Sequence, residues 1–160
     1  METASINEIK KELETIPAEA VLQNCLRLAR YKKENKELLS YLLFEAVDEQ
    51  SFINQVQQEV DSQFRNLNRS NLYLAKKTVR KVLKTTNKYI RFSPHRTTEL
   101  ELLIYFCKKL QKSGLPVSRS KILRNMYHRE LSRIERVMSM LHEDLQYDYR
   151  YEVEALRGNH

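Results

Sequence analysis

Apolar residues recur three and four positions apart along most of the chain, the spacing of amphipathic helices. The first run starts at Ser5, where Glu8 three residues later completes a capping-box pattern, and it ends at Pro17. The second run extends to about Tyr31. Its predicted buried face consists of Val21, Leu22, Cys25, Leu26 and Ala29.

The stretch ELLSYLLFEA, residues 37–46, has apolar side chains around nearly the whole circumference of a helix. A helix that is hydrophobic all round either crosses a membrane or lies buried among other helices. The stretch is too short for a membrane span, which needs about 20 residues. We therefore expect residues 37–46 to form a buried central helix surrounded by other helices.

Three further helices follow, each preceded by a residue that favours a helix start. Asp48 precedes the fourth helix, Asn68 or Ser70 the fifth, and Ser93 with Pro94 the sixth. Their predicted buried positions are Phe52, Ile53, Val56, Val60, Phe64 and Leu67, then Leu72, Ala75, Val79, Val82, Leu83, Thr86 and Ile90. The sixth helix, TELELLIYFCKKL, is strongly apolar, so residues 100–107 are expected to form the centre together with residues 37–46.

The sixth helix is expected to end at Gly114 and Pro116, and a seventh to start near Ser118, with an apolar stripe that reaches Leu145. The tail, 146–160, fits two patterns. Its tyrosines alternate with polar residues as in a strand, yet its apolar positions also have helical spacing. A lone strand would have no sheet to join, so continuation of the last helix is favoured.

Composition supports the same fold class. The chain has 160 residues, with only two Gly and three Pro, which argues against a turn-rich β fold. We predict one all-α domain over 1–160, with about seven helices arranged as an antiparallel array or as an irregular bundle.

The chain also shows features of a cytoplasmic protein. The N-terminus is charged and lacks the apolar core of a secretory signal, and no window is apolar enough to cross a membrane. Cys25 and Cys107 lie on apolar helical faces, where we expect free, buried thiols.

A short internal similarity indicates a possible duplication. RYKKENKELLSYLLF from Arg30 and RFSPHRTTELELLIYF from Arg91 each join an Arg–aromatic pair to a Glu-Leu-Leu-x-Tyr helix. Two copies, at about 18–67 and 70–145, or chance similarity between leucine-rich helices both explain the match.

This pseudo-repeat, with successive helices and short connectors over residues 5–145, resembles an α-solenoid of the HEAT type. The segment RYKKENKELLSYLLFEA is similar to small all-helical bacterial proteins of unknown activity. The HEAT-like resemblance implies a scaffold that binds proteins or nucleic acid along a surface.

Charge is distributed very unevenly. Residues 1–64 have a net charge of −5, residues 65–136 of +15, and residues 137–160 of −3, which gives +7 overall. Within the basic middle, one stripe of cations follows the fifth helix at spacings of three and four. A second series lies on the seventh helix. The candidate anion-binding residues are Lys77, Arg80, Lys81, Lys84, Lys88 and Arg91 on the fifth helix, and Arg129, Arg133 and Arg136 on the seventh.

Three explanations fit the two cationic series. The first is that they are solvated faces, paired with the acidic N-terminal half of the chain. The second is that they contact nucleic acid, and the third is that they contact an acidic protein. Like charges along one face repel one another, and an anionic partner would relieve this repulsion.

Catalytic chemistry is not indicated. Two separated glycines cannot form a phosphate loop, and the four histidines form neither a zinc-protease motif nor Glu-x-x-His pairs. The sequence therefore predicts a protein that is not an enzyme and has no metal or cofactor. We expect a helical binding or scaffold protein with a basic face for an anionic macromolecule, nucleic acid or acidic protein, and no membrane partner. The alternative is a protein–protein adaptor, or a homodimer, whose basic half docks on an acidic surface.

Overall fold

The computed structural model describes residues 1–158, which contain eight α-helices and no strand, so the all-α prediction is confirmed. One segment, Tyr41–Glu45, is a π-helix. The α-helices are α1 (Ile6–Thr15), α2 (Ala18–Tyr31), α3 (Lys33–Ser40), α4 (Glu49–Arg65), α5 (Leu72–Ile90), α6 (Arg96–Gln111), α7 (Lys121–Ser139) and α8 (Glu143–Arg157).

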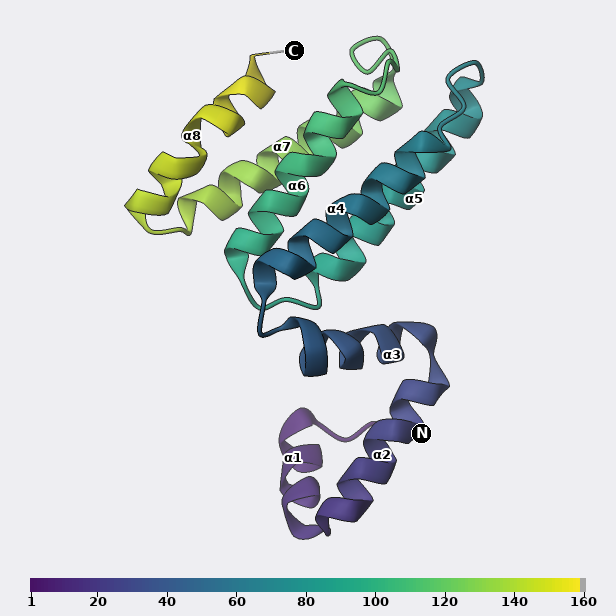
Figure 1. Ribbon diagram of the computed structural model, residues 1–160, viewed down its shortest axis with the longest axis vertical. Coiled ribbons are helices and arrows are strands. Elements are labelled where there is room, and N and C mark those ends of the chain that lie inside the picture. The colour runs from purple at the N-terminus through teal and green to yellow at the C-terminus, as the bar shows by residue number, and fades with distance from the viewer. Residues whose placement is uncertain (159–160) are drawn as a thin grey trace. The chain divides into compact units, whose positions relative to one another are not determined.

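The chain divides into two compact units, an N-terminal unit over Met1–Phe44 and a C-terminal unit that begins at Glu45. The first contains α1–α3 and the second α4–α8 (Figure 1). A division into compact units does not decide whether they form one domain. The single domain over 1–160 and the duplication at about 18–67 and 70–145 therefore stay predictions.

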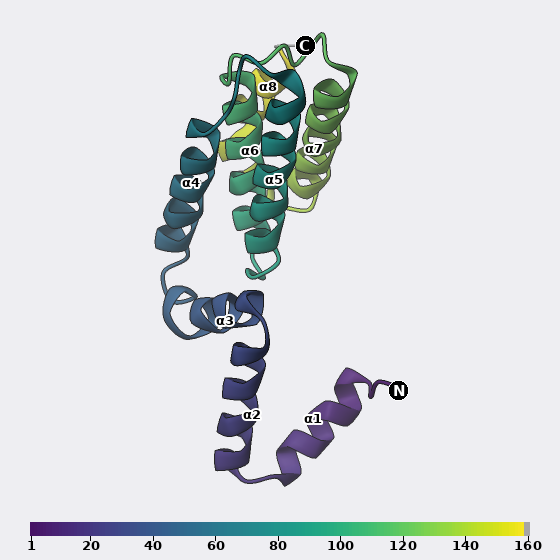
Figure 2. The ribbon, with the colours of Figure 1, turned by 90° about the vertical axis from the view of Figure 1, so that its right-hand side faces the viewer.

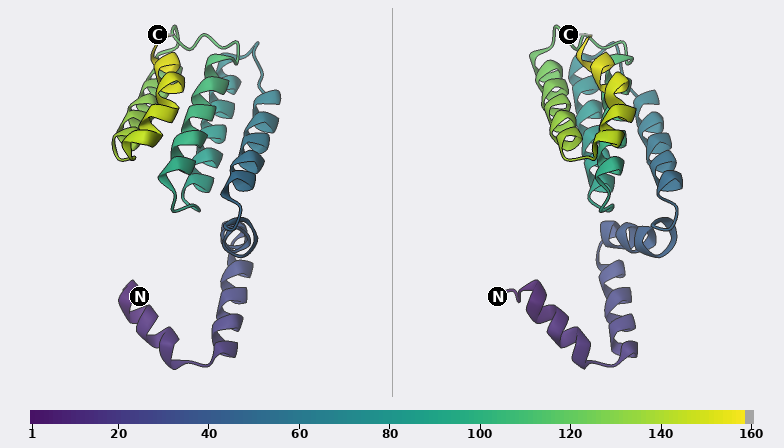
Figure 3. Two further views of the ribbon diagram at one scale, coloured as in Figure 1. Left: turned by 60° about the vertical axis from the view of Figure 1, so that its left-hand side comes forward. Right: turned by 90° about the vertical axis from the view of Figure 1, so that its left-hand side faces the viewer.

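The helices of the C-terminal unit pack in two layers. Helices α4, α6 and α8 lie side by side in one layer, with α6 in the middle (Figure 3). Helices α5 and α7 form the other layer, in which α5 covers α4 and α6, and α7 covers α6 and α8 (Figure 2). This arrangement confirms a packed helical array, and it leaves the outer faces of α5 and α4 open to solvent.

Residues 100–107 lie at the centre of this unit, as predicted. Helix α6 packs against all four other helices of the unit, so it lies in the middle of the array. Buried α6 residues at this centre are Leu100, Leu102, Leu103, Ile104, Phe106 and Cys107. Contacts with four neighbouring helices explain why residues 100–107 are mostly apolar, whereas Glu101 and Tyr105 stay half-buried.

The prediction that residues 37–46 form a second buried centre is wrong. Tyr41 is only 2% exposed, but Leu42, Leu43 and Phe44 are 56%, 60% and 70% exposed. Helix α3 ends at Ser40, and α1, α2 and α3 contain no fully buried residue. In the N-terminal unit α2 packs against α3, and no further helix of that unit encloses the apolar segment.

The predicted buried face of α2 is wrong for the same reason. Leu22 is exposed, and Val21, Cys25, Leu26 and Ala29 are only half-buried, because a single neighbouring helix covers one side of α2.

Several helix starts were predicted correctly and others were displaced. The Ser5–Glu8 capping box is present, and the Asp48 carboxylate accepts a hydrogen bond from the Ser51 amide at 3.0 Å. Helix α5, however, is capped by Asn71 rather than by Asn68 or Ser70. Helices α6 and α7 start two to three residues later than Ser93 and Ser118 suggest, at Arg96 and Lys121.

The tail is helical, but it does not continue the seventh helix. Helix α7 ends at Ser139 and a new helix, α8, begins at Glu143. The apolar stripe predicted to extend to Leu145 therefore belongs to two helices. Residues 159–160 of the predicted tail lie outside the described residues. In the part of the chain that the structure describes, each helix is too short or too polar to cross a bilayer.

Candidate anion-binding surfaces

The sequence of α5 places its cations on the side away from the core. Ala75, Val79, Val82 and Thr86 recur at helical spacing and are buried against the other helices. The intervening cations therefore lie on the opposite face. We name them the α5 stripe; its members are Lys77, Arg80, Lys81, Lys84, Lys88 and Arg91, of which Lys88 is half-buried and the others are exposed.

The charges of the α5 stripe are not offset along the chain. Between Asp61 and Glu99 the sequence has ten Lys and Arg residues and no Asp or Glu. Among residues 1–158, no carboxylate lies within ion-pair distance of Lys77, Lys81 or Lys84. Like charges on this solvated face repel one another, and Lys77, Lys81 and Lys84 have no internal carboxylate to offset that repulsion.

Aromatic rings order two side chains of the α5 stripe. The Lys77 ammonium lies 5.0 Å from the centre of the Tyr73 ring, and the Lys88 ammonium lies 4.4 Å from the centre of the Tyr89 ring. These cation–π contacts favour defined positions for both cations without cancelling their charge.

The second predicted series separates into two kinds of residue. Arg129 and Arg136 are exposed on α7, and the Arg129 Nε lies 3.3 Å from Glu130. Arg133 is 24% exposed and is bound inside the array.

The guanidinium of Arg133 joins three helices. It donates hydrogen bonds to Glu99 on α6 at 2.8 Å and to Asn87 on α5 at 2.5 Å, and its Nη1 lies 3.7 Å from Glu130. Because its donors already have partners, Arg133 holds α5 and α7 together rather than facing an external anion.

A second cationic site lies between α4 and α6. It is an open cleft of about 600 Å³, which we name the α4–α6 cleft. Its lining residues are Asp61, Phe64, Arg65, Arg69, Tyr105, Lys108, Lys109, Lys112 and Ser113, so five cations and one carboxylate surround it.

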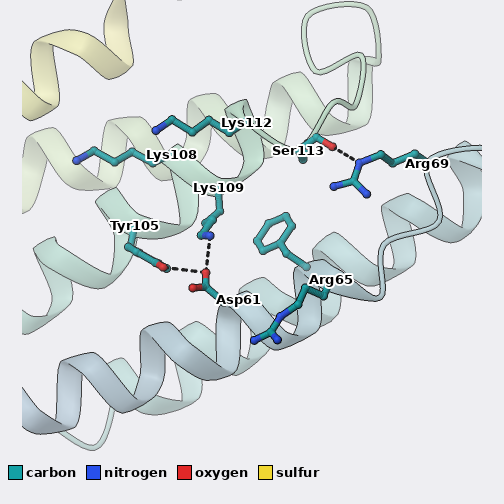
Figure 4. A pocket seen from close by; sticks show the side chains of 9 residues that line it. Asp61, Arg65, Arg69, Tyr105, Lys108, Lys109, Lys112 and Ser113 are labelled. Carbon is teal, nitrogen blue, oxygen red and sulfur yellow. Dashed lines mark hydrogen bonds and ion pairs between the residues drawn. The ribbon is translucent and has the colours of Figure 1, made fainter.

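Two cations of the α4–α6 cleft, Lys109 and Arg69, are held by defined contacts (Figure 4). Lys109 lies 2.6 Å from the Asp61 carboxylate, which also accepts a hydrogen bond from the Tyr105 hydroxyl at 2.8 Å. Arg69 reaches from the α4–α5 loop and donates its Nε–H to the Ser113 carbonyl at 2.7 Å.

The turn after α6 presents that carbonyl. Gly114 has a φ of +79°, a conformation that favours glycine, and a Cβ there would approach the Arg69 Nε to 3.5 Å. The glycine therefore permits the turn that presents the carbonyl, and the arginine side chain packs beside it at ordinary contact distance.

Charge changes sign along α6. At the edge of the cleft, Lys108 forms an ion pair with Glu152 of α8. Toward the N-terminal end of α6, Glu101 accepts a hydrogen bond from the Tyr149 hydroxyl at 2.6 Å. Glu101, Glu152 and Lys108 line a neighbouring, smaller depression. The cationic end is therefore near the C-terminal ends of α4 and α6, around Arg65, Arg69 and Lys112.

Sequence reasoning missed the α4–α6 cleft because its residues come from two separate segments, and the pairs that contact each other across it are 44 positions apart. Arg65 and Arg69, and likewise Lys108 and Lys112, are spaced by four residues, a spacing that would place each pair on one side if the helix continued through it. That spacing was the available signal, but which pairs face each other depends on how α4 packs on α6.

Burial shifts two titratable groups near the centre. Desolvation, with the hydrogen bond to Asp61 as a second cause, raises the pKa of Tyr105 to about 12. Desolvation and the nearby Glu130 charge raise the pKa of the Cys107 thiol to about 12. Both groups are therefore protonated at neutral pH, and a reactive thiolate at Cys107 is disfavoured.

Comparison with known proteins gives no family for this chain: no family model, no curated protein and no solved structure matches it. Within the described residues, no three His, Cys, Asp or Glu side chains are grouped closely enough to hold a metal ion.

Proposed function

We propose that this protein is a non-catalytic helical scaffold that binds the sugar–phosphate backbone of nucleic acid through the α5 stripe. The observation that carries the proposal is the row of exposed cations on the outer face of α5, in a region of sequence without acidic residues. Clustered cations on one exposed face are the electrostatic feature common to phosphate-binding surfaces.

The length of the α5 stripe favours an extended polyanion over a small one. From Lys77 to Arg91 the helix rises about 21 Å, at 1.5 Å per residue. One DNA strand presents about six phosphates over that length, at about 3.4 Å per phosphate along the axis. Six cations and six phosphates are therefore comparable in number and extent.

Arg129 and Arg136 extend the same surface in this proposal. They lie one turn before and one turn after Arg133, whose contact with Asn87 holds α7 beside α5. Because both are exposed, they add cations at the edge of the α5 stripe, whereas Arg133 contributes to the fold.

The first test is binding of labelled duplex DNA and single-stranded RNA, measured by fluorescence anisotropy over a range of salt concentrations. Six phosphate contacts predict a slope of about −5 in a plot of log affinity against log salt for duplex DNA. Lack of binding to either nucleic acid at low salt would rule out the proposal.

A matched pair of variants locates the contact. The triple variant Lys77→Glu, Lys81→Glu, Lys84→Glu should abolish binding, because three attractive contacts become repulsive. The control variant Lys11→Glu, Lys32→Glu, Lys121→Glu has the same change in net charge at exposed positions elsewhere. Equal loss in the two variants would indicate a general charge effect and contradict a contact at α5.

A protein–protein adaptor, or homodimer, is the second candidate, and it is favoured by a different observation. Most of the large exposed apolar side chains lie in the N-terminal unit, among them Ile6, Leu28, Leu43 and Phe44. Exposed apolar side chains that gather on one surface are typical of protein-interaction sites.

Light scattering at low and high salt tests this candidate. Docking through the basic half would weaken as salt rises, whereas association through apolar side chains would persist. A monomeric mass under both conditions would exclude the homodimer.

A further inference from the structure

The structure assigns a second, independent binding site to this protein: the α4–α6 cleft binds a small molecule that carries two or more phosphate groups. The site is separate from the α5 stripe, because its cations come from α4, α6 and the two turns that follow these helices. It therefore does not depend on nucleic-acid binding at α5.

The first argument is the charge that remains after internal pairing. Of the five cations that line the cleft, Lys109 pairs with Asp61 and Lys108 pairs with Glu152, so two carboxylates offset two cations. The C-terminal ends of α4 and α6 contribute about half a negative charge each. Roughly two positive charges remain, which suits an anion with a charge of −2 or more.

The second argument is which cations remain available. Arg65 and Lys112 are exposed, and among the described residues neither has an ion pair with a carboxylate. Arg69 uses its Nε–H on the Ser113 carbonyl, which fixes the plane of the guanidinium and leaves both terminal nitrogens for a ligand (Figure 4). A fixed guanidinium fork matches two oxygens of one phosphate group.

The third argument is shape. The cleft of about 600 Å³ has a size typical of small-molecule sites, and the Phe64 ring lines it beside the polar groups. The ion pair and hydrogen bond at Asp61 hold Lys109 and Tyr105 in place before a ligand arrives. A cleft with prearranged donors loses less entropy on binding than a set of mobile surface lysines.

Calorimetric titration of the full chain with inorganic tripolyphosphate and with ATP tests the site. ATP compared with tripolyphosphate shows whether the polyphosphate alone is recognised or a nucleoside adds affinity. Saturable binding with one site per chain is expected for both probes at low salt. No saturable heat with either probe would overturn the inference.

Paired variants separate the cleft from general charge. Arg65→Gln with Lys112→Gln should weaken binding of tripolyphosphate by about 100-fold, because two charge-assisted contacts are lost. Lys11→Gln with Lys32→Gln removes the same charge at exposed positions outside both proposed sites and should leave the affinity within about twofold. An equal effect of the two pairs would refute a site in the cleft.

A third variant probes the geometry of the arginine. Arg69→Lys keeps the charge but loses the fork, so we expect about tenfold weaker binding with an unchanged melting temperature. Affinity equal to that of the unmodified chain would contradict the assigned role of Arg69. Failure of DNA or RNA binding in the anisotropy experiment would affect only the α5 stripe, so the two proposals fail separately.

Discussion

Arg133 shows how one side chain can link the layers of this array. Its partners are a carboxylate on α6, an amide on α5 and the nearly buried Glu130 one turn away on α7. Glu130 is 4% exposed, so its charge depends on nearby cations for compensation. Arg133, which the sequence suggested as a contact for an external anion, is therefore part of the internal structure.

Replacing Arg133 by Met should lower the free energy of unfolding by about 2 kcal/mol. Breaking a buried ion pair costs about 3–5 kcal/mol, and the partial exposure of Arg133 reduces the effect. Urea denaturation measures the change. Arg136→Met, the same substitution on the exposed side of α7, is the control and should change stability by less than about 0.5 kcal/mol. Similar losses in both variants would show that the Arg133 contacts do not stabilise the fold.

At the scale of helices, two segments with the same local pattern have different environments. Both 37–46 and 100–107 include the Leu-Leu-x-Tyr sequence, and both were predicted to be central. Residues 100–107 are buried because α6 has four neighbours, whereas residues 42–44 are exposed because the N-terminal unit has too few helices to cover them. Hydrophobicity shows that a segment requires partners, but sequence alone does not show whether those partners are present.

Helix faces were more predictable than helix packing. The six predicted core residues of α4 are buried, as are Ala75, Val79 and Val82 of α5, because periodicity fixes the side of a helix that an apolar residue occupies. The α5 stripe follows from the same periodicity. The α4–α6 cleft does not, because it depends on tertiary contacts between α4, α6 and the turns after them.

The cap of α5 offers a test at this scale. Asn71 accepts a hydrogen bond from the Leu74 amide at 3.1 Å, whereas Ser70 makes a local hydrogen bond with Asn68. Asn71→Ala should therefore lower the free energy of unfolding by about 1 kcal/mol, the usual value for loss of an N-cap.

Ser70→Ala is the matched control, and its effect on the same denaturation curve should be no more than a few tenths of a kcal/mol. A larger loss for Ser70→Ala than for Asn71→Ala would place the start of α5 where the sequence pattern had suggested.

At the scale of the whole molecule, the excess of positive charge and the hydrophobic core lie in the same part of the chain. Residues 1–44 have seven Lys and Arg and seven Asp and Glu, whereas residues 45–160 have 21 against 14. All the buried apolar residues except Tyr41 also fall within the C-terminal unit. Both proposed anion sites therefore belong to the unit that has a hydrophobic core.

This distribution predicts that residues 45–160 fold without the rest of the chain. A fragment with this core should unfold cooperatively, with a melting temperature within about 5 °C of the full chain, because the removed residues contribute little buried apolar surface. Circular dichroism melting measures this. The complementary fragment 1–44 should show low helicity without a cooperative transition, because its isolated helices are short and bury no residue fully. A non-cooperative melt of 45–160 would mean that the core of α4–α8 depends on the first 44 residues.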